Sequence, residues 1–160
     1  MANFTWFKNN ISDNLLIKQV YGIVFLDDGR VLLRIEDNKY KLTGGKPENN
    51  ETFEETLKRE YIEELNVELV ECYYLGYLLV EEDNEKYAQV RMVAKIKRIN
   101  DKNADIDTGK MYDRKLVNAN NVKKYLRYND KAGNLMIDDA IYMAQKKYEF
   151  FKLNMNEEII

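Results

Sequence analysis

Histidine is absent from this chain, and cysteine and proline occur once each. The absence of histidine excludes histidine-based catalytic triads, His–Cys pairs and imidazole metal sites. The single cysteine, Cys72, cannot form an internal disulfide or a cysteine-based zinc cluster, and its apolar neighbours predict a buried small side chain. Acid–base or metal chemistry must therefore depend mainly on Asp, Glu, Lys or Tyr.

The sequence also lacks a basic block, a long apolar run and a linker. Its formal net charge of −3 gives no electrostatic case for binding duplex nucleic acid. The first residues lack the apolar core of a signal peptide, and no run is long enough to span a membrane. We therefore expect one domain, residues 1–160, in the cytoplasm and without a membrane partner. No sequence feature specifies an oligomeric state.

Hydrophobic periodicity divides the chain into strands and helices. Six segments have the apolar and β-branched composition of strands: residues 19–26, 30–36, 39–43, 67–82, 86–98 and 115–117. The turn Asp27-Asp28-Gly29 should join the first two strands as a hairpin. The strand over residues 39–43 should run into Gly44-Gly45 and then Lys46-Pro47, where regular structure should stop. Residues 100–110 should form an exposed loop.

Three segments are predicted to be helical: residues 53–65, 121–126 and 135–152. The last has one core-facing stripe, formed by Ile137, Ala140, Ile141, Ala144, Tyr148 and Phe151. Strands with helices packed on either side predict an α/β layered sandwich with a mixed β-sheet.

The helix over residues 53–65 has an unusual distribution of acidic residues. Thr52 and Glu55 match a capping box at its start. Its apolar arc consists of Phe53, Leu57, Tyr61 and Leu65. Glu60 and Glu64 overlap the edge of this arc, and Glu63 continues the same side. Carboxylates one turn apart repel each other on a bare helix, whereas a bound Mg²⁺ would stabilise them.

A solvated charged face is the alternative explanation, since most Glu-rich helices carry one. Arg59 is compatible with either, because it lies in ion-pair register with both Glu55 and Glu63. Helix geometry alone leaves the two explanations open.

A longer pattern spans the helix and the loop before it. Gly45, Glu51, Arg59, Glu60, Glu63 and Glu64 together have the spacing G-x5-E-x7-R-E-x-x-E-E. Six such positions would agree by accident on the order of once in ten thousand chains. This pattern, within residues 45–67, resembles the Nudix box, the signature of a family of hydrolases that cleave diphosphate linkages. The hairpin before it and the long strands after it also fit, so the resemblance covers most of the chain in outline.

The sequence departs from the usual Nudix pattern at three places. Asn66 replaces the glycine that usually ends the helix, but asparagine also tolerates the left-handed conformation of a C-cap. Tyr61 occupies a usually aliphatic position, and Thr43 replaces the proline before the glycine pair. None of the three changes removes an acidic residue.

The resemblance implies a Nudix-like α/β/α sandwich and a Mg²⁺-dependent pyrophosphohydrolase, with Mn²⁺ as an alternative metal. Its implied metal ligands are Glu60, Glu63 and Glu64, with the Gly45 carbonyl oxygen close by. Glu51 and Arg59 are implied to orient the acidic side chains. Either Glu60 or Glu64 is implied as the group that takes a proton from the attacking water.

The family often takes a further acid from a later loop, and Asp107 and Asp113 are the candidates. The implied substrate is a nucleoside diphosphate linked to another group X. One alternative is a nucleoside triphosphate pyrophosphohydrolase. The other is a Nudix-fold sensor without catalysis, and the complete set of acidic residues in the box argues against it. Tyrosines could stack on a nucleobase, but those in the predicted strands are expected to be mainly structural. Arg34, Lys41 and Arg91 are ambiguous candidates for gripping phosphate.

Overall fold

The computed structural model describes residues 1–160. Its strands are β1 (Asn3–Phe7), β2 (Leu16–Phe25), β3 (Val31–Glu36), β4 (Lys39–Lys41), β5 (Thr43–Gly45), β6 (Val67–Glu82), β7 (Glu85–Ile99), β8 (Asp113–Val117) and β9 (Glu158–Ile159). Its helices are α1 (Phe53–Leu65), the short 3₁₀ turn η1 (Ala119–Asn121), α2 (Val122–Leu126) and α3 (Lys131–Lys147).

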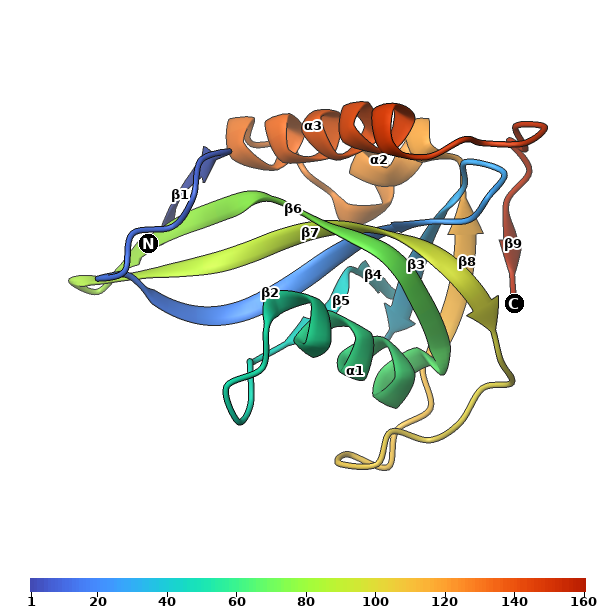
Figure 1. Ribbon diagram of the computed structural model, residues 1–160, viewed down its shortest axis with the longest axis horizontal. Coiled ribbons are helices and arrows are strands. Elements are labelled where there is room, and N and C mark those ends of the chain that lie inside the picture. Colours follow the sequence, from blue (N-terminus) through green and yellow to red (C-terminus); the bar gives the residue numbers. More distant parts are fainter.

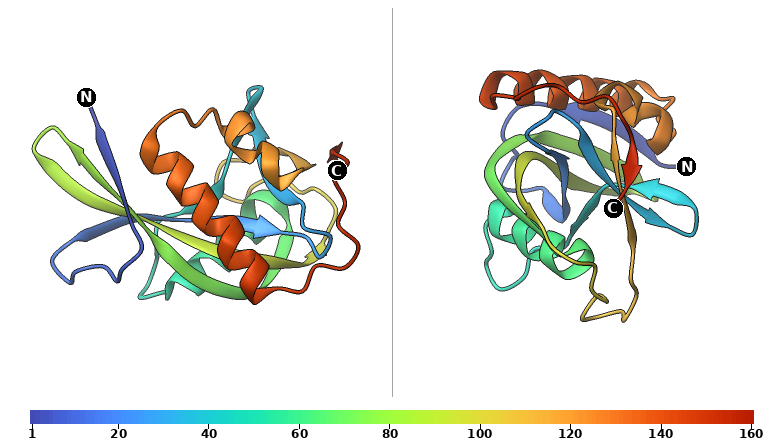
Figure 2. Two further views of the ribbon diagram at one scale, coloured as in Figure 1. Left: turned by 90° about the horizontal axis from the view of Figure 1, so that it is seen from above. Right: turned by 90° about the vertical axis from the view of Figure 1, so that its right-hand side faces the viewer.

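The strands form one mixed sheet in the order β1-β6-β7-β2-β3-β8-β9, with β4 paired to β3 and β5 paired to β2. Only the β2–β7 pair is parallel. Helix α1 covers one face of the sheet, and α2 and α3 cover the other (Figures 1 and 2). This arrangement confirms the predicted α/β/α sandwich with a mixed sheet.

Two hydrophobic cores lie on the two faces of the sheet. On the α3 side, Met136, Ile137 and Ala140 are fully buried against residues of β2, β3 and β7. On the α1 side, Leu57 and Tyr61 are fully buried against a second set of strand residues. The alternation of apolar side chains along the central strands supplies both cores, because successive residues of a strand point to opposite faces.

Several predicted elements are confirmed with small changes. Helix α1 has the predicted bounds, and the long strands β6 and β7 are joined by Asp83 and Asn84, both with positive φ. The hairpin turn between β2 and β3 is present, with Gly29 at a φ of +86°. Residues 100–110 contain no strand or helix, as expected.

Regular structure stops at Gly45, before Lys46-Pro47, as predicted, but the bounds of the strand that precedes this stop are wrong. The predicted strand at residues 39–43 is broken at Leu42, and the glycine pair belongs to β5. Gly44 and Gly45 pair with Tyr21 and Val20 of β2. Glycine is favoured at these two positions because neighbouring backbone and side-chain atoms approach too closely for a Cβ atom.

The bounds predicted for the last helix are also wrong. Asp130 accepts a hydrogen bond from the Gly133 N–H at 3.2 Å and starts α3 earlier than the apolar stripe indicates. The helix ends before Tyr148, whose ring is buried, whereas Phe151 lies outside the helix and is 65% exposed. Edge strands β1 and β9 were not predicted. Cys72, predicted to be buried, is only half-buried.

No helix of the structure combines the length and the apolar character needed to cross a membrane.

Candidate active site

Helix α1 is fixed at both ends by local hydrogen bonds. The Thr52 hydroxyl accepts from the Glu55 N–H at 3.1 Å, and the Glu55 carboxylate accepts from the Thr52 N–H at 3.0 Å, which confirms the capping box. Asn66 ends the helix in the left-handed conformation, at φ 52° and ψ 49°, as expected for its C-cap role. The Tyr61 hydroxyl donates to the Gly22 carbonyl of β2 at 3.1 Å, so the helix is also tied to the sheet.

The glycine pair lies directly beneath the helix. A Cβ atom at Gly45 would lie 2.2 Å from Glu60 Oε1, and one at Gly44 would lie 1.9 Å from the Val20 carbonyl oxygen. Both distances are far shorter than van der Waals contact. At Gly44 the close atoms belong to the β2 backbone, so only glycine fits there, whereas a side chain at Gly45 would displace the Glu60 carboxylate. The structure therefore brings the Gly45 backbone and the Glu60 carboxylate together.

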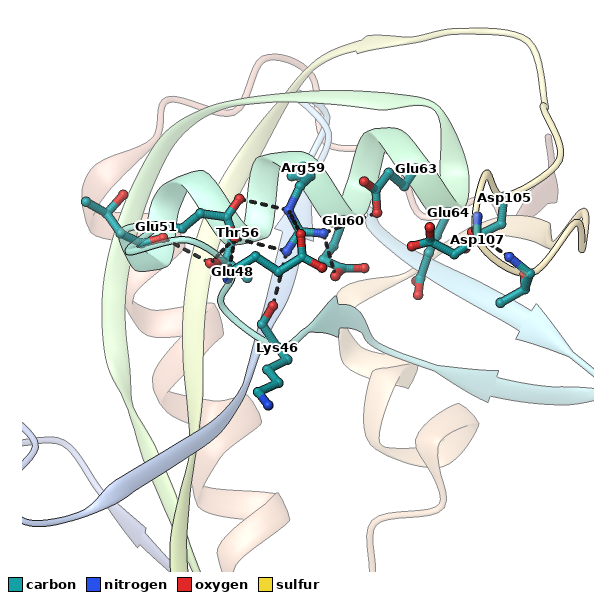
Figure 3. Close-up of polar contacts among 12 residues, drawn as sticks. Lys46, Glu48, Glu51, Thr56, Arg59, Glu60, Glu63, Glu64, Asp105 and Asp107 are labelled. Carbon is teal, nitrogen blue, oxygen red and sulfur yellow. Dashed lines mark hydrogen bonds and ion pairs between the residues drawn. The ribbon is translucent and has the colours of Figure 1, made fainter.

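Arg59 is the centre of a network of charge-assisted hydrogen bonds (Figure 3). It binds Glu51 through two nitrogens, at 2.8 and 3.0 Å, and donates to Glu60 at 2.9 Å and to Glu63 at 3.2 Å. The predicted pairing with Glu63 is confirmed. The pairing with Glu55 is not made, because that carboxylate serves the capping box instead.

Glu51 is held in its ionised form. Its carboxylate accepts hydrogen bonds from Arg59, from the Glu48 N–H and from the Thr56 hydroxyl. Chiefly because of Arg59, the pKa of Glu51 is lowered to about 2. Glu51 and Arg59 thus connect the loop before α1 to the acidic residues of the helix.

Glu64 points away from this network and pairs with Arg34 of β3 at 2.8 Å. Burial raises the pKa of Glu64 to about 7, since it disfavours the charged form more than Arg34 favours it. Burial also raises the pKa values of Glu60 and Glu63. The Arg34 contact was not predicted, because it joins positions that share no sequence pattern.

The burial of these side chains argues against a solvated charged face. The side chains of Glu60 and Glu64 are 14% and 12% exposed, although they belong to a helix on the surface of the protein. A charged face that served only solubility would project into water. This row of carboxylates, formed by Glu60, Glu63 and Glu64, instead lies at the boundary between helix and core, as its overlap with the apolar arc predicted.

The loop at residues 100–110 brings two further acidic residues, Asp105 and Asp107, to the C-terminal end of α1 (Figure 3). The charge of Asp107 contributes to the raised pKa of Glu63, and the charge of Asp105 contributes to that of Glu64. Asp105, which was not among the predicted residues, is 7% exposed and accepts from the Asp107 N–H at 2.8 Å. The Asp-x-Asp-Thr-Gly turn is the signal in the sequence that could have indicated it.

Asp113, the other predicted loop acid, begins β8 instead. It is paired with Lys102 at 2.7 Å, and its side chain is largely exposed. The structure therefore separates the two candidates: Asp107 lies near the row of carboxylates, and Asp113 forms a surface ion pair.

The fit of the row to a metal ion depends on donor chemistry and on placement. Its donors are carboxylate oxygens, which hard divalent cations prefer. As placed, however, no three acidic, cysteine or histidine side chains of the protein are grouped closely enough to hold a metal ion. Arg59 holds Glu60 and Glu63, and Arg34 holds Glu64. The donors suit Mg²⁺ or Mn²⁺, and each of the three carboxylates uses one oxygen for an arginine, but binding a metal would require the carboxylates to move closer together.

The Nudix class of protein is defined by two features together. One is a mixed sheet between two helical layers, and the other is the G-x5-E-x7-R-E-x-x-E-E segment, which leads into a helix on one face of that sheet. The family model described as "NUDIX domain" matches residues 16–133, which is most of the chain. This chain belongs to the Nudix family. The membership confirms the enzyme class expected from the sequence, a Nudix-type pyrophosphohydrolase.

Solved structures of Nudix proteins share the fold. The Bacillus subtilis pyrophosphohydrolase BsRppH is 23% identical, with a TM-score of 0.66 over 85% of this chain and 88% of its own. A NUDIX hydrolase from Nitrosomonas europaea is 18% identical, with a TM-score of 0.60 over 89% and 98%. A NUDIX-family hydrolase from Clostridium perfringens is 19% identical, with a TM-score of 0.55 over 81% and 98%. No curated protein matches this chain significantly.

Proposed function

We propose that this protein is a divalent-metal-dependent hydrolase that cleaves the diphosphate linkage of a nucleoside diphosphate bonded to another group X. The observation that carries the proposal is the row formed by Glu60, Glu63 and Glu64, held by two arginines at the edge of the core. With Glu51, these are four carboxylates against two arginines, and a divalent cation would balance the remaining negative charge. A small nucleotide, rather than duplex nucleic acid, is the proposed partner.

Glu60, Glu63 and Glu64 would hold Mg²⁺ or Mn²⁺, with the Gly45 carbonyl oxygen nearby. A divalent cation, when bound, neutralises phosphate charge and lowers the pKa of the attacking water. Glu51 would keep Arg59 in place, and Arg59 would orient the row through its bonds to Glu60 and Glu63.

The reaction also needs a group that accepts a proton. Water would attack one phosphorus atom, the bond from that phosphorus to the bridging oxygen would break, and the proton of the water would pass to a carboxylate. Glu64 and Glu60 are the two candidates for this base, because both lie in the row beside the proposed metal. Asp105 and Asp107 lie close enough to the row to assist by charge.

The proposal is tested by assaying a panel of nucleoside diphosphate conjugates and nucleoside triphosphates with and without metal. Turnover is expected in Mg²⁺ or Mn²⁺, its loss in EDTA, and its recovery when metal is restored. Chromatography of the products separates the main proposal from its alternative, because a triphosphatase of this kind releases pyrophosphate. Full activity in metal-free buffer would contradict the mechanism. Metal-independent binding of nucleotides without any turnover would favour the sensor alternative.

A further inference from the structure

A polar pocket of about 430 Å³ opens on the α3 side of the sheet, between β2, β4 and β7 and the segment that follows α2. Its lining includes three basic residues and no acidic residue. The basic residues are Arg34, Lys41 and Arg91. Tyr21 and Tyr128 are among the aromatic residues of its wall. A pocket of this size, rich in positive charge and aromatic rings, suits an anionic ligand with a flat ring.

The pocket adjoins the row of carboxylates. Arg34 lines the pocket and at the same time donates to Glu64 at 2.8 Å. The ring of Tyr21 lies next to Gly44, since a Cβ atom at that glycine would be 2.8 Å from Tyr21 Cδ1. A ligand in the pocket would therefore lie beside the groups that are proposed to carry out hydrolysis.

Arg91 is the residue of the pocket whose charge has no partner in the protein. It is 5% exposed, and its guanidinium lies over the Tyr21 ring, 4.7 Å from the centroid. Its polar contacts are the Gln89 side-chain oxygen at 3.3 Å, the Val90 carbonyl at 3.4 Å, the Met136 sulfur at 3.1 Å and the hydroxyl of Tyr128. None of them is a carboxylate, and burial accordingly lowers the pKa of Arg91.

The two other deeply buried arginines have closer polar partners than Arg91, although Nε of Arg114 is buried without a hydrogen bond. Arg30 pairs with Asp28 at 2.8 Å and with Glu158 at 3.0 Å. Arg114 donates to the carbonyl oxygens of Leu65 and Asn100 at 2.8 and 2.7 Å, the first of which is at the negative end of α1. Arg91 has neither a carboxylate partner nor a carbonyl contact shorter than 3.3 Å, and such a buried charge is unfavourable, so an external anion is the expected partner of Arg91.

We propose that Arg91 determines substrate specificity by binding a phosphate of the nucleotide that is not the one attacked, while the base lies among the pocket tyrosines. A guanidinium suits this role because it can donate two parallel hydrogen bonds to phosphate oxygens. The proposal deepens the proposed function by naming the nucleotide part of the substrate and its binding site, and it rests on that function only for the reaction that follows binding.

The test measures binding without metal or turnover. In EDTA, the melting temperature of the protein is followed with the four nucleoside 5′-monophosphates, the matching nucleosides and inorganic phosphate. At least one monophosphate is expected to stabilise the wild type more than its nucleoside does, and more than inorganic phosphate does at the same concentration. Arg91→Met should lose this difference. Arg98→Met should keep it, because Arg98 lies on the same strand with an exposed side chain.

Each other outcome overturns the proposal. Equal stabilisation by a nucleoside and its monophosphate would show that the phosphate does not contribute to binding. Equal stabilisation by inorganic phosphate and the monophosphate would show that the base does not contribute. Unchanged ligand responses in Arg91→Met would show that Arg91 does not bind the phosphate. Without ligand, Arg91→Met should melt no lower than the wild type, since it removes an unpaired buried charge. A markedly lower melting temperature would assign Arg91 a structural role.

A second variant, Arg91→Lys, tests the role of the guanidinium without removing the positive charge. Arg91→Lys retains the charge but not the two parallel donors. It should raise the KM of the hydrolysed nucleotide by about tenfold with little change in kcat, the pattern of a lost binding contact. A fall in kcat with unchanged KM would contradict the proposal. Binding in EDTA and metal-dependent turnover are separate measurements, so this inference and the proposed function can fail independently.

Discussion

At the scale of single residues, the pairing of Glu64 with Arg34 distinguishes this carboxylate from its neighbours. Glu60 and Glu63 share Arg59 on their own helix, whereas Glu64 is held across the layer boundary by a residue of β3. Arg34 has one further nitrogen, Nε, that is buried without a hydrogen-bond partner. An anion or a water molecule beside Glu64 would satisfy it.

Glu64→Gln is expected to lower turnover by about 100-fold or more, the scale for losing a metal-binding or general-base group. The fold should survive, because glutamine has nearly the same shape and its amide oxygen can still accept from Arg34. Steady-state kinetics with a urea unfolding curve measure both effects. Glu54→Gln is the matched control, since Glu54 is on the same helix and pairs with Lys58. Wild-type turnover in Glu64→Gln would show that Glu64 has neither role.

A second residue-scale prediction concerns acid stability. The pKa of Glu51 is lowered from 4.5 to about 2 in the folded protein, so its stabilising effect is present above about pH 4.5 and is lost as the pH falls toward 2. Glu51→Gln should therefore lower the urea midpoint at pH 6, and the difference from wild type should shrink between pH 4.5 and 3. A difference that stayed constant over this range would mean that the Arg59–Glu51 pair does not stabilise the fold.

Some of these residues could be found from the sequence and some could not. Gly45, Glu51, Arg59 and the acidic residues of α1 lie within one short segment, so their spacing located them. Arg34 approaches Glu64 only through the register of β3 against its neighbours, and Asp105 reaches α1 only through the course of a loop. Contacts of this kind depend on the packing of distant segments, which no local period encodes.

At the scale of elements, α1 depends on its first turn. Thr52→Ala removes the hydroxyl that accepts from the Glu55 N–H and is expected to cost about 1 kcal/mol of unfolding free energy. Glu55→Gln should cost much less, because an amide oxygen can still accept from the Thr52 N–H. Urea unfolding of the two variants separates the hydrogen bonds of the capping box from the charge of Glu55. A loss in Glu55→Gln as large as that in Thr52→Ala would contradict this, because it would show that the charge of Glu55 matters as much as the Thr52 hydroxyl.

The elements themselves were largely predictable, for physical reasons. The period of α1 and the composition of β6 and β7 are strong local signals, and the structure agrees with them closely. The end of α3 was not predictable from the apolar stripe, because Tyr148 is buried in an extended conformation after the helix ends. The edge strands β1 and β9 are short and mostly exposed, so they carry little hydrophobic pattern.

At the scale of the whole molecule, a bound metal should be visible as stability. Ligand that binds only the folded state raises stability by RT ln(1 + [L]/Kd), so millimolar Mg²⁺ at about four times its Kd should contribute about 1 kcal/mol. The wild type should then melt a few degrees higher in Mg²⁺ or Mn²⁺ than in EDTA at matched ionic strength. Glu60→Gln/Glu64→Gln should respond less to metal. Equal responses in both proteins would overturn the metal assignment, because screening by salt acts on both alike.

The parallel pairing of β2 with β7 has a consequence for how the chain is made. This pair runs from Leu16 opposite Tyr87 to Phe25 opposite Lys95, partners about 70 positions apart in the sequence. Synthesis proceeds from the N-terminus, so α1 is complete well before β7 leaves the ribosome. Until then β2, to which α1 is tied through Tyr61 and Gly22, lacks its parallel neighbour. A nascent chain at this stage carries every residue of the Nudix box but not the finished sheet that holds them in place.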